Sequence, residues 1–318
     1  MLLKSADDKS RRVSLLEDLQ KSPLLDARQK LWLRQELGRL RKGIEGERDS
    51  AYYLDHYFKG GENHVLLHDL RFEFEGDVAQ IDHLIINRLG FMFLIETKNY
   101  GGSVSVNAHG EFTVDYDGDR FGVPSPIEQS KRHERVLRRL FERLEISNRK
   151  GMIEAHHVVM YHPKAIIARP KQAEFDTSNV IKSDQFPSWH EKFANGIGVG
   201  TLVHAIANMR SIETISDWGA RLLRQHRPAN LLALPDFMQP KSPPPLPPPP
   251  PPAAVNKPHA PTSPHADVIA PAALKPSQKK LVCLQCHSKI SFAEGKFCWN
   301  DVARFKGGQY CRQHQAAF

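Results

Sequence analysis

A proline-rich segment is the strongest constraint on how this 318-residue chain can fold. Of the 23 prolines, 16 lie between Pro235 and Pro276, and Pro247 to Pro252 form an unbroken run. Proline fixes φ and removes the backbone donor, so such a stretch continues neither a helix nor a sheet. We therefore expect a semi-rigid spacer over residues 236–280, with a folded part on each side. The same tract could instead be a ligand for a protein partner with an aromatic groove.

The overall composition is that of a soluble globular protein, with 40% hydrophobic and 25% charged residues. There are 44 Lys+Arg against 36 Asp+Glu, and the resulting net charge of +8 favours polyanionic partners such as nucleic acid. No run approaches the roughly 18 apolar residues that a membrane span requires. The N-terminus is charged where a signal peptide would be apolar. We expect a cytoplasmic protein that has no membrane partner.

All cysteines lie in the last 36 residues, in a pattern typical of a metal site. Cys283-x-x-Cys286 and Cys311-x-x-His314 are two pairs of ligands at the spacing of structural zinc sites. Residues 281–318 are too few for a competent apolar core, so bound Zn²⁺ would supply the folding free energy. Cys298 could replace His314 as the fourth ligand. A redox Cys-x-x-Cys would need a thioredoxin-like setting, which the sequence lacks.

Apolar periodicity before the spacer changes from helical to extended and back. Leucines at near-helical spacing predict amphipathic helices in the first 40 residues. Val78 to Ile86 and Phe91 to Ile95 are short apolar runs joined by a turn at residues 87–90, which predicts a β-hairpin. Later segments predict an amphipathic helix at 128–146, strands near 155–161 and 179–181, and helices near 200–210 and 215–226. The expected class is α/β or α+β with a mixed sheet.

The ends of the two hairpin strands carry a candidate catalytic group. Asp82 lies in the first strand, whereas Glu96 and Lys98 close the second and share a face, because strand side chains alternate. Pairing would place Asp82 roughly opposite Glu96, and both carboxylates could then bind one Mg²⁺ or Mn²⁺ ion. Lys98 could orient or deprotonate the attacking water and balance charge on phosphate oxygens. The simpler interpretation is a salt-bridged strand end.

Two further residues could belong to the same site. Glu47 follows Gly43 and Gly46, whose missing side chains allow close backbone approach, and it could supply a third carboxylate. Gln129 opens the amphipathic helix on its inward side, where an amide needs a polar partner. Alternatively, Glu47 is an exposed helix residue and Gln129 belongs to a helix cap.

The helix that follows Gln129 carries a basic face that could bind phosphates in a salt-sensitive, sequence-independent manner. Such a face can equally be a solvated helix surface. Its residues are Lys131, Arg132, Arg135, Arg138 and Arg139.

These motifs resemble the nuclease-related domain family, NERD, which is similar in turn to the restriction-endonuclease-like PD-(D/E)xK superfamily. The resemblance covers roughly residues 40–165 and implies a restriction-endonuclease-like mixed β-sheet flanked by helices. It also implies that Asp82 and Glu96 are metal ligands, that Lys98 is the catalytic lysine, that Glu47 is a helix-borne acid and that Gln129 is a site-supporting amide. The C-terminal cysteine module resembles the small zinc ribbons of topoisomerases. The matching motifs are Gly43-x-x-Gly46-Glu47, Gln80-Ile81-Asp82-His83-Leu84, Ile95 to Gly102, and Pro126 to Gln129 with the basic helix.

The sequence thus predicts a metal-dependent nuclease or nuclease-like DNA-processing protein that hydrolyses phosphodiester bonds. We expect nucleic acid, DNA in the first place, as the partner. The alternative is a non-catalytic adaptor that binds nucleic acid or a protein. Four parts are expected: a helical preface (1–40), a nuclease-related domain (41–235), a proline-rich linker (236–280) and a zinc-binding module that aids nucleic-acid binding (281–318).

Overall fold

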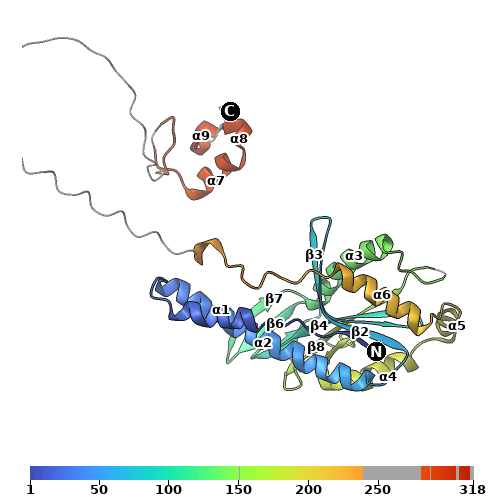
Figure 1. Cartoon of the computed structure of the whole chain (residues 1–318). Helices are drawn as coiled ribbons and strands as arrows, with labels where there is room; N and C mark the ends of the chain where they lie inside the picture. Colours follow the sequence, from blue (N-terminus) through green and yellow to red (C-terminus); the bar gives the residue numbers. More distant parts are fainter. Residues whose placement is uncertain (150, 239–280, 287, 306–307, 316–318) are drawn as a thin grey trace, which may run out of the picture. The chain divides into compact units, whose positions relative to one another are not determined.

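The computed structural model describes residues 1–149, 151–238, 281–286, 288–305 and 308–315. Contacts divide the chain into two compact units, Met1–Pro245 and Leu246–Phe318 (Figure 1). The expected linker lies almost entirely outside the described residues, so its role as a spacer or a docking ligand stays a prediction. Within the described residues, no helix is both long and apolar enough to cross a membrane.

The first unit is built around a six-stranded mixed sheet with the strand order β1-β2-β3-β4-β8-β10. Strands β2, β3 and β4 are antiparallel to one another, whereas β1 joins β2, and β8 joins β4 and β10, in parallel. The predicted mixed α/β class is therefore confirmed. The strands are β1 (Leu2–Lys4), β2 (His64–Phe74), β3 (Asp77–Asn87), β4 (Phe91–Lys98), β8 (Glu154–Tyr161) and β10 (Val180–Lys182).

Helices cover both faces of this sheet. Helices α3 and α6 lie above it in Figure 1 and α2 and α4 below it, each side with its own apolar core. Because both faces are covered, β4 is buried from Phe91 to Glu96 and shows no alternation of apolar and polar residues. The helices are α2 (Ala27–Phe58), α3 (Pro126–Arg143), α4 (Phe186–Asn195), α5 (Val199–Ala207) and α6 (Ile212–Gln225), with 3-10 turns η1 (Ser183–Gln185) and η2 (Asp236–Met238).

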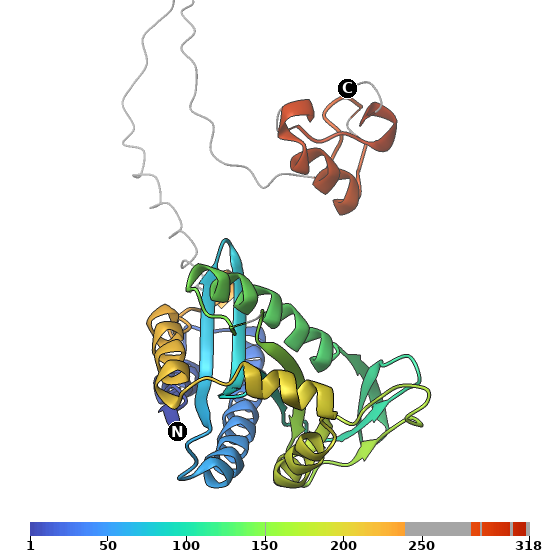
Figure 2. The ribbon, with the colours of Figure 1, turned by 90° about the vertical axis from the view of Figure 1, so that its right-hand side faces the viewer.

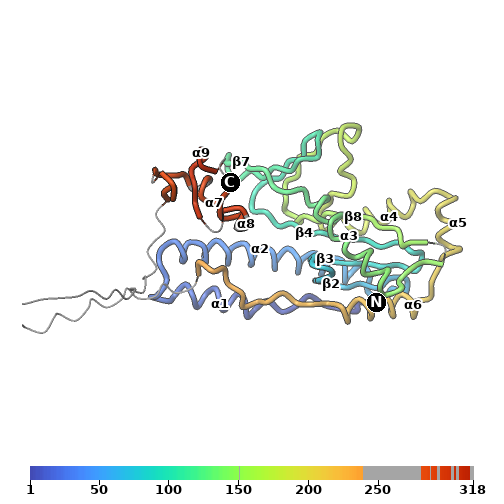
Figure 3. Tube along the Cα trace, turned by 90° about the horizontal axis from the view of Figure 1, so that it is seen from above, coloured from blue at the N-terminus to red at the C-terminus, as the bar shows by residue number. Residues whose placement is uncertain are grey.

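One long helix connects the N-terminal segment to the sheet. Helix α2 begins at a capping box made by Asp26 and Gln29. Its first half packs against α1 (Ser10–Lys21) through Leu16 and Leu33, and the two helices run side by side in Figure 3. The second half continues beneath the sheet to Phe58, so the boundary expected after residue 40 falls inside a single helix. This continuity brings Glu47 next to the strands.

A second, four-stranded sheet follows β4 and was not foreseen from the sequence. Its strand order is β7-β6-β5-β9, and Figure 2 shows it beside the larger sheet. Its inner side packs on Val159 and Tyr161 of β8. The strands are β5 (Ser103–Val106), β6 (Phe112–Tyr116), β7 (Asp119–Val123) and β9 (Ile167–Ala168).

The described part of the second unit is small and mostly helical. A capping box formed by Ser291 and Glu294 starts the first helix, and one β-bridge joins Val282 to Lys289. The sequence suggested a zinc ribbon, a fold built from strands, whereas the described part of this module is built mainly from helices. The helices are α7 (Phe292–Asn300), α8 (Val302–Phe305) and α9 (Arg312–Gln315).

Candidate active site and zinc module

A pocket of about 780 Å³ brings the predicted catalytic residues together. It is bounded by α2, β3, β4 and α3, and by Tyr116 of β6 and Phe121 of β7. The hairpin register pairs His83 with Ile95, so the next position places Asp82 opposite Glu96, as the sequence predicted. The five predicted residues that line the pocket are Glu47, Asp82, Glu96, Lys98 and Gln129.

Lys98 is held by two neighbours inside the pocket. Its Nζ donates to Glu96 Oε1 at 2.7 Å and to Gln129 Oε1 at 3.1 Å. Burial favours the neutral amine, but the Glu96 and Asp82 carboxylates outweigh it and raise the pKa of Lys98. Lys98 is therefore an ammonium here, which suits charge stabilisation better than deprotonation of water. Ser125 caps α3 instead, so Gln129 is not the capping residue.

Two carboxylates line the pocket side by side on the paired strands: Asp82 is half-buried and Glu96 is buried. Asp82 Oδ2 accepts a hydrogen bond of 2.7 Å from the backbone N–H of Thr97. Burial, reinforced by the charges of Glu96 and Glu47, raises the pKa of Asp82 well above its ordinary value. Burial also raises the pKa of Glu96, against the opposing effect of Lys98. A divalent cation would relieve this repulsion, and carboxylate oxygens are the donors that Mg²⁺ prefers, so these two residues fit such an ion.

Glu47 reaches the pocket because α2 passes very close to the end of β4. A Cβ atom at Gly46 would lie 2.7 Å from Asn99 Cβ, so only glycine allows this approach. Glu47 Oε2 lies 2.5 Å from Lys9 Nζ, which also lies 3.2 Å from Asp69 Oδ2. Burial raises the pKa of Glu47, and Lys9 opposes that change.

The three acidic groups do not converge as tightly as the sequence suggested. Among the described residues, the ligand atoms of Glu47, Asp82 and Glu96 do not form a set within 4.8 Å of one another. The physical reason is that each has its own partner: Lys9 holds Glu47, the Thr97 N–H holds Asp82, and Lys98 holds Glu96. Asp82 and Glu96 come from paired strands, and Glu47 reaches the same pocket from α2.

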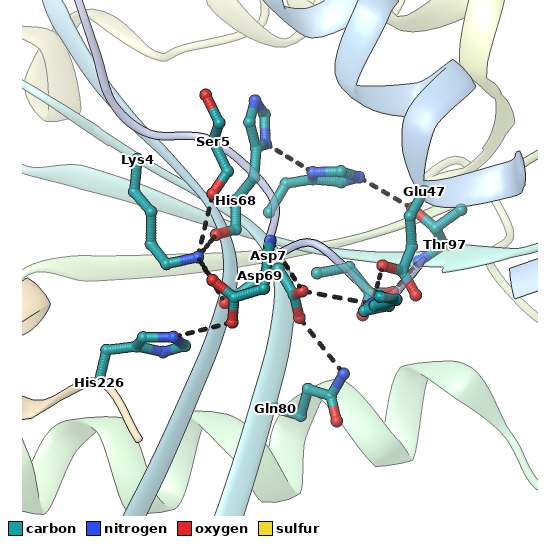
Figure 4. Close-up of polar contacts among 12 residues, drawn as sticks. Lys4, Ser5, Asp7, Glu47, His68, Asp69, Gln80, Thr97 and His226 are labelled. Atoms are coloured by element: carbon teal, nitrogen blue, oxygen red, sulfur yellow. Dashed lines mark hydrogen bonds and ion pairs between the residues drawn. The ribbon is translucent and has the colours of Figure 1, made fainter. Parts of the chain in front are cut away.

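Sequence analysis missed two residues that support the site from the N-terminal segment and β2. Lys9 and Asp69 join Glu47 and Gln80 in a polar network, part of which Figure 4 shows. Lys9 stands in a charged stretch that looks solvated in the sequence, and 38 positions separate it from Glu47, so local spacing carries no signal.

His133 was also assigned no role, although it lies one turn beyond Gln129 on the same face of α3. Its Nδ1 lies 3.9 Å from Glu96 Oε2, and its side chain lines the pocket. Burial, with the nearby charges of Arg132 and Lys98, lowers the pKa of His133 to about 4. The i, i+4 spacing from Gln129 is the signal that could have found it.

The basic face of α3 is partly neutralised by acidic neighbours. Lys131 pairs with Glu128, Arg138 with Glu134, and Arg139 with Glu75 and Asp77. Arg132 and Arg135 are exposed, and neither pairs with a carboxylate in the described part of the chain. These two arginines are therefore the free cations of this face that a phosphate could meet.

In the second unit, the four preferred metal ligands lie together. The ligand atoms of Cys283, Cys286, Cys311 and His314 all lie within 4.8 Å of one another. His314 Nδ1 is 3.5 Å from Cys283 Sγ and 3.2 Å from Cys311 Sγ, and the Cys286 and Cys311 sulfurs are 3.8 Å apart. Thiolates about 2.3 Å from a tetrahedral Zn²⁺ would be about 3.8 Å apart, so this donor set fits zinc.

Cys298, the alternative ligand, lies outside that group. Its Sγ accepts hydrogen bonds from the Tyr310 backbone N–H at 3.4 Å and from Gln315 Nε2 at 3.4 Å. The side chain is buried, and its partners come from the segment that leads into and through α9. Cys298 thus has a packing role in this geometry.

Residues 42–162 match the family model of the nuclease-related domain, NERD. The match confirms the resemblance seen in the sequence, and it spans all five predicted catalytic residues. A search of curated proteins and a search of solved structures each gave no match to the chain.

Proposed function

We propose that the nuclease-related domain of this chain is a metal-dependent nuclease that hydrolyses phosphodiester bonds. The observation that supports this most directly is the Lys98 ammonium, held between Glu96 and Gln129 in the same pocket as Asp82. A phosphodiester develops negative charge on its oxygens during hydrolysis, and a fixed cation beside a carboxylate pair is suited to stabilise it.

Asp82 and Glu96 would hold Mg²⁺ or Mn²⁺. When bound, such an ion neutralises charge on the phosphate oxygens and lowers the pKa of a coordinated water. Lys98 donates hydrogen bonds toward the reacting group and remains protonated, while Gln129 keeps its ammonium in place. Glu47, aligned by Lys9, adds a third carboxylate at the edge of the pocket.

Nucleic-acid binding is the second part of the proposal. Arg132 and Arg135 follow Gln129 along α3 and are exposed, so they suit contacts with phosphates near the pocket. Neutralising two phosphates on duplex DNA steepens the salt dependence of binding by roughly 1.8 in log–log slope. Replacing both arginines with alanine should remove that increment, whereas Arg138→Ala should not, because Arg138 already pairs with Glu134.

The zinc module is proposed to add a second contact with the same polymer. The Cys₃His group would hold Zn²⁺, and the ion would supply the folding free energy that so short a segment cannot obtain from burial alone. Joining two binding modules raises avidity without new contacts, provided that both reach one strand. Removing residues 281–318 should therefore weaken binding to long strands more than to short ones.

The decisive experiment is a cleavage assay with purified full-length protein, labelled single- and double-stranded DNA, and Mg²⁺ or Mn²⁺. Wild type should cut, whereas Lys98→Ala and Asp82→Asn should lose at least about 100-fold in rate, as for other residues that stabilise transition-state charge. Lys59→Ala, at the exposed end of α2, serves as the matched lysine control. Equal cutting by wild type and Lys98→Ala would overturn the proposal, and binding without cleavage would favour the adaptor.

A further inference from the structure

We infer that the mouth of the active-site pocket stacks an unpaired nucleobase on Phe121, so that the substrate is a single strand or an unpaired end rather than an intact duplex. This inference rests on the proposed function only in requiring that nucleic acid enters the pocket. It is carried by an exposed aromatic ring and a neighbouring cation that line the same pocket as Asp82 and Lys98.

Phe121 stands on the β6–β7 hairpin in the second sheet. The register pairs Phe121 with Val114 and Asp119 with Tyr116, so Phe121 and Tyr116 are diagonal neighbours on one face. Their rings are stacked, with centroids 5.5 Å apart and an angle of 16° between the planes. Phe121 nevertheless keeps 49% of its surface exposed, and it does so at the pocket that holds the candidate catalytic residues. The hairpin thus presents a fixed apolar ring to solvent.

A cation lies beside this pair of rings. Lys42 Nζ sits 5.7 Å from the centre of the Tyr116 ring, and Lys42 also lines the pocket. Gly101 permits this placement, because a Cβ atom there would lie 2.3 Å from Lys42 Nζ. In the described part of the chain, no carboxylate pairs with Lys42, so its ammonium can meet a phosphate. Aromatic rings alternating with basic groups are the usual arrangement for binding single strands.

The geometry favours an unpaired base over a paired one. In a duplex both faces of each base are covered by neighbouring pairs, so a protein ring can stack only on a base that is terminal, flipped or single-stranded. The pocket volume of about 780 Å³ accommodates a nucleotide-sized group. A base on Phe121 would leave its phosphate free to approach Lys98 and the strand carboxylates deeper in the pocket.

The test measures binding in buffer without Mg²⁺, Mn²⁺ or chelator, so that hydrolysis lacks its metal while the zinc module keeps its own, with the full chain and three DNA probes. The probes are a non-self-complementary single strand, a strand of the same length in which every sugar is abasic, and a dumbbell duplex whose ends are closed by non-nucleotide linkers. Phe121→Ala should weaken binding of the intact single strand by roughly 5- to 150-fold, the usual range for one stacked base. Phe121→Trp should preserve binding, and Tyr52→Ala, which changes an exposed aromatic on α2 outside the pocket, should not change it.

The abasic strand separates stacking from any general loss of affinity. Wild type and Phe121→Ala should bind that strand and the dumbbell equally, because neither offers a base to the ring. Equal affinity of both proteins for the intact strand, or an equal loss on all three probes, would overturn the inference. If the protein does not cleave DNA but its binding of the single strand still depends on Phe121, the proposed hydrolysis is refuted and this inference stands.

Discussion

His68 Nδ1 lies 2.7 Å from His83 Nδ1 inside the sheet domain, so one ring must donate and the other accept. Asp55 Oδ1 lies 3.0 Å from His68 Nε2, and a carboxylate accepts, so the proton of His68 is on Nε2. Burial lowers the pKa of both histidines, which keeps each ring neutral with one N–H. His83 therefore donates through Nδ1, and its Nε2 accepts from Thr97 Oγ1, 3.1 Å away. Figure 4 shows this chain running from His68 to Thr97, whose backbone N–H holds Asp82.

The histidine pair should behave as a coupled unit in unfolding experiments. His83→Leu leaves His68 Nδ1 buried without a donor, and His68→Leu leaves the His83 Nδ1–H buried without an acceptor. Each should reduce the free energy of unfolding by about 1–3 kcal/mol, measured by urea denaturation. The double variant should lose less than the sum of the two, because neither imidazole is left unpaired. Strict additivity would show that the two rings do not depend on each other.

Two glycines of α2 should respond in opposite ways to the same substitution. Gly46→Ala places a methyl group 2.7 Å from Asn99 Cβ, so α2 or the end of β4 must move. We expect a loss of about 1–3 kcal/mol in the free energy of unfolding, together with reduced cleavage, because Glu47 moves with the helix. Gly38→Ala meets nothing within 4 Å and should stabilise the protein by about 0.5–1 kcal/mol through helix propensity. Similar effects of both substitutions would contradict the close approach at Gly46.

The central part of the site could be predicted because it depends on local features of the sequence. Two apolar runs joined by a four-residue turn fix the hairpin register, and the register places Asp82 opposite Glu96. The amphipathic period of α3 places Gln129 on the buried side, where it meets Lys98. Each of these inferences needs only the period of a strand or a helix.

Other parts depend on contacts that no local period records. The strands of the second sheet have two to five residues, too few for alternation to stand out, so the sequence gives no sign that Phe121 lies on a strand. The pairing of Lys9 with Glu47 joins the N-terminal segment to the middle of α2 and follows from tertiary packing. The looser arrangement of the three carboxylates has the same origin, because it results from partners that the sequence did not reveal.

Substitutions of Cys286 and of Cys298 should have different effects on zinc binding. Cys286→Ser removes one of the four clustered ligands, so the full-length protein should lose zinc to a chelator at lower concentration than wild type. Cys298→Ser changes a sulfur that contacts Tyr310 and Gln315 and should retain one zinc ion per chain. Native mass spectrometry measures how much zinc each variant retains. Zinc loss from Cys298→Ser with retention by a His314→Ala variant would identify Cys298 as the fourth ligand instead.

Stability should decrease in mild acid because His64 is buried as the neutral form. The centroid of its ring lies 4.6 Å from that of the Phe58 ring and 5.7 Å from that of the His190 ring. Burial, with the charges of His190 and the N-terminus, lowers the pKa of His64 from 6.5 to about 4. The unfolded chain therefore binds a proton between pH 6.5 and 4 that the folded state resists, so the contribution of His64 is fully present above pH 6.5 and is lost as the pH falls toward 4. The loss should amount to about 1–3 kcal/mol, allowing for partial solvent access.

The control variant keeps an aromatic ring at position 64 but removes the titratable imidazole. His64→Phe keeps an aromatic group among Phe58 and His190, so urea denaturation at pH 7.5, 6 and 5 should show a smaller decrease than in wild type. His109→Gln, which changes an exposed loop histidine, should leave the wild-type decrease intact. If His64→Phe and wild type lose stability in parallel as the pH falls, the acid sensitivity arises at other buried histidines, and His64 is not its source.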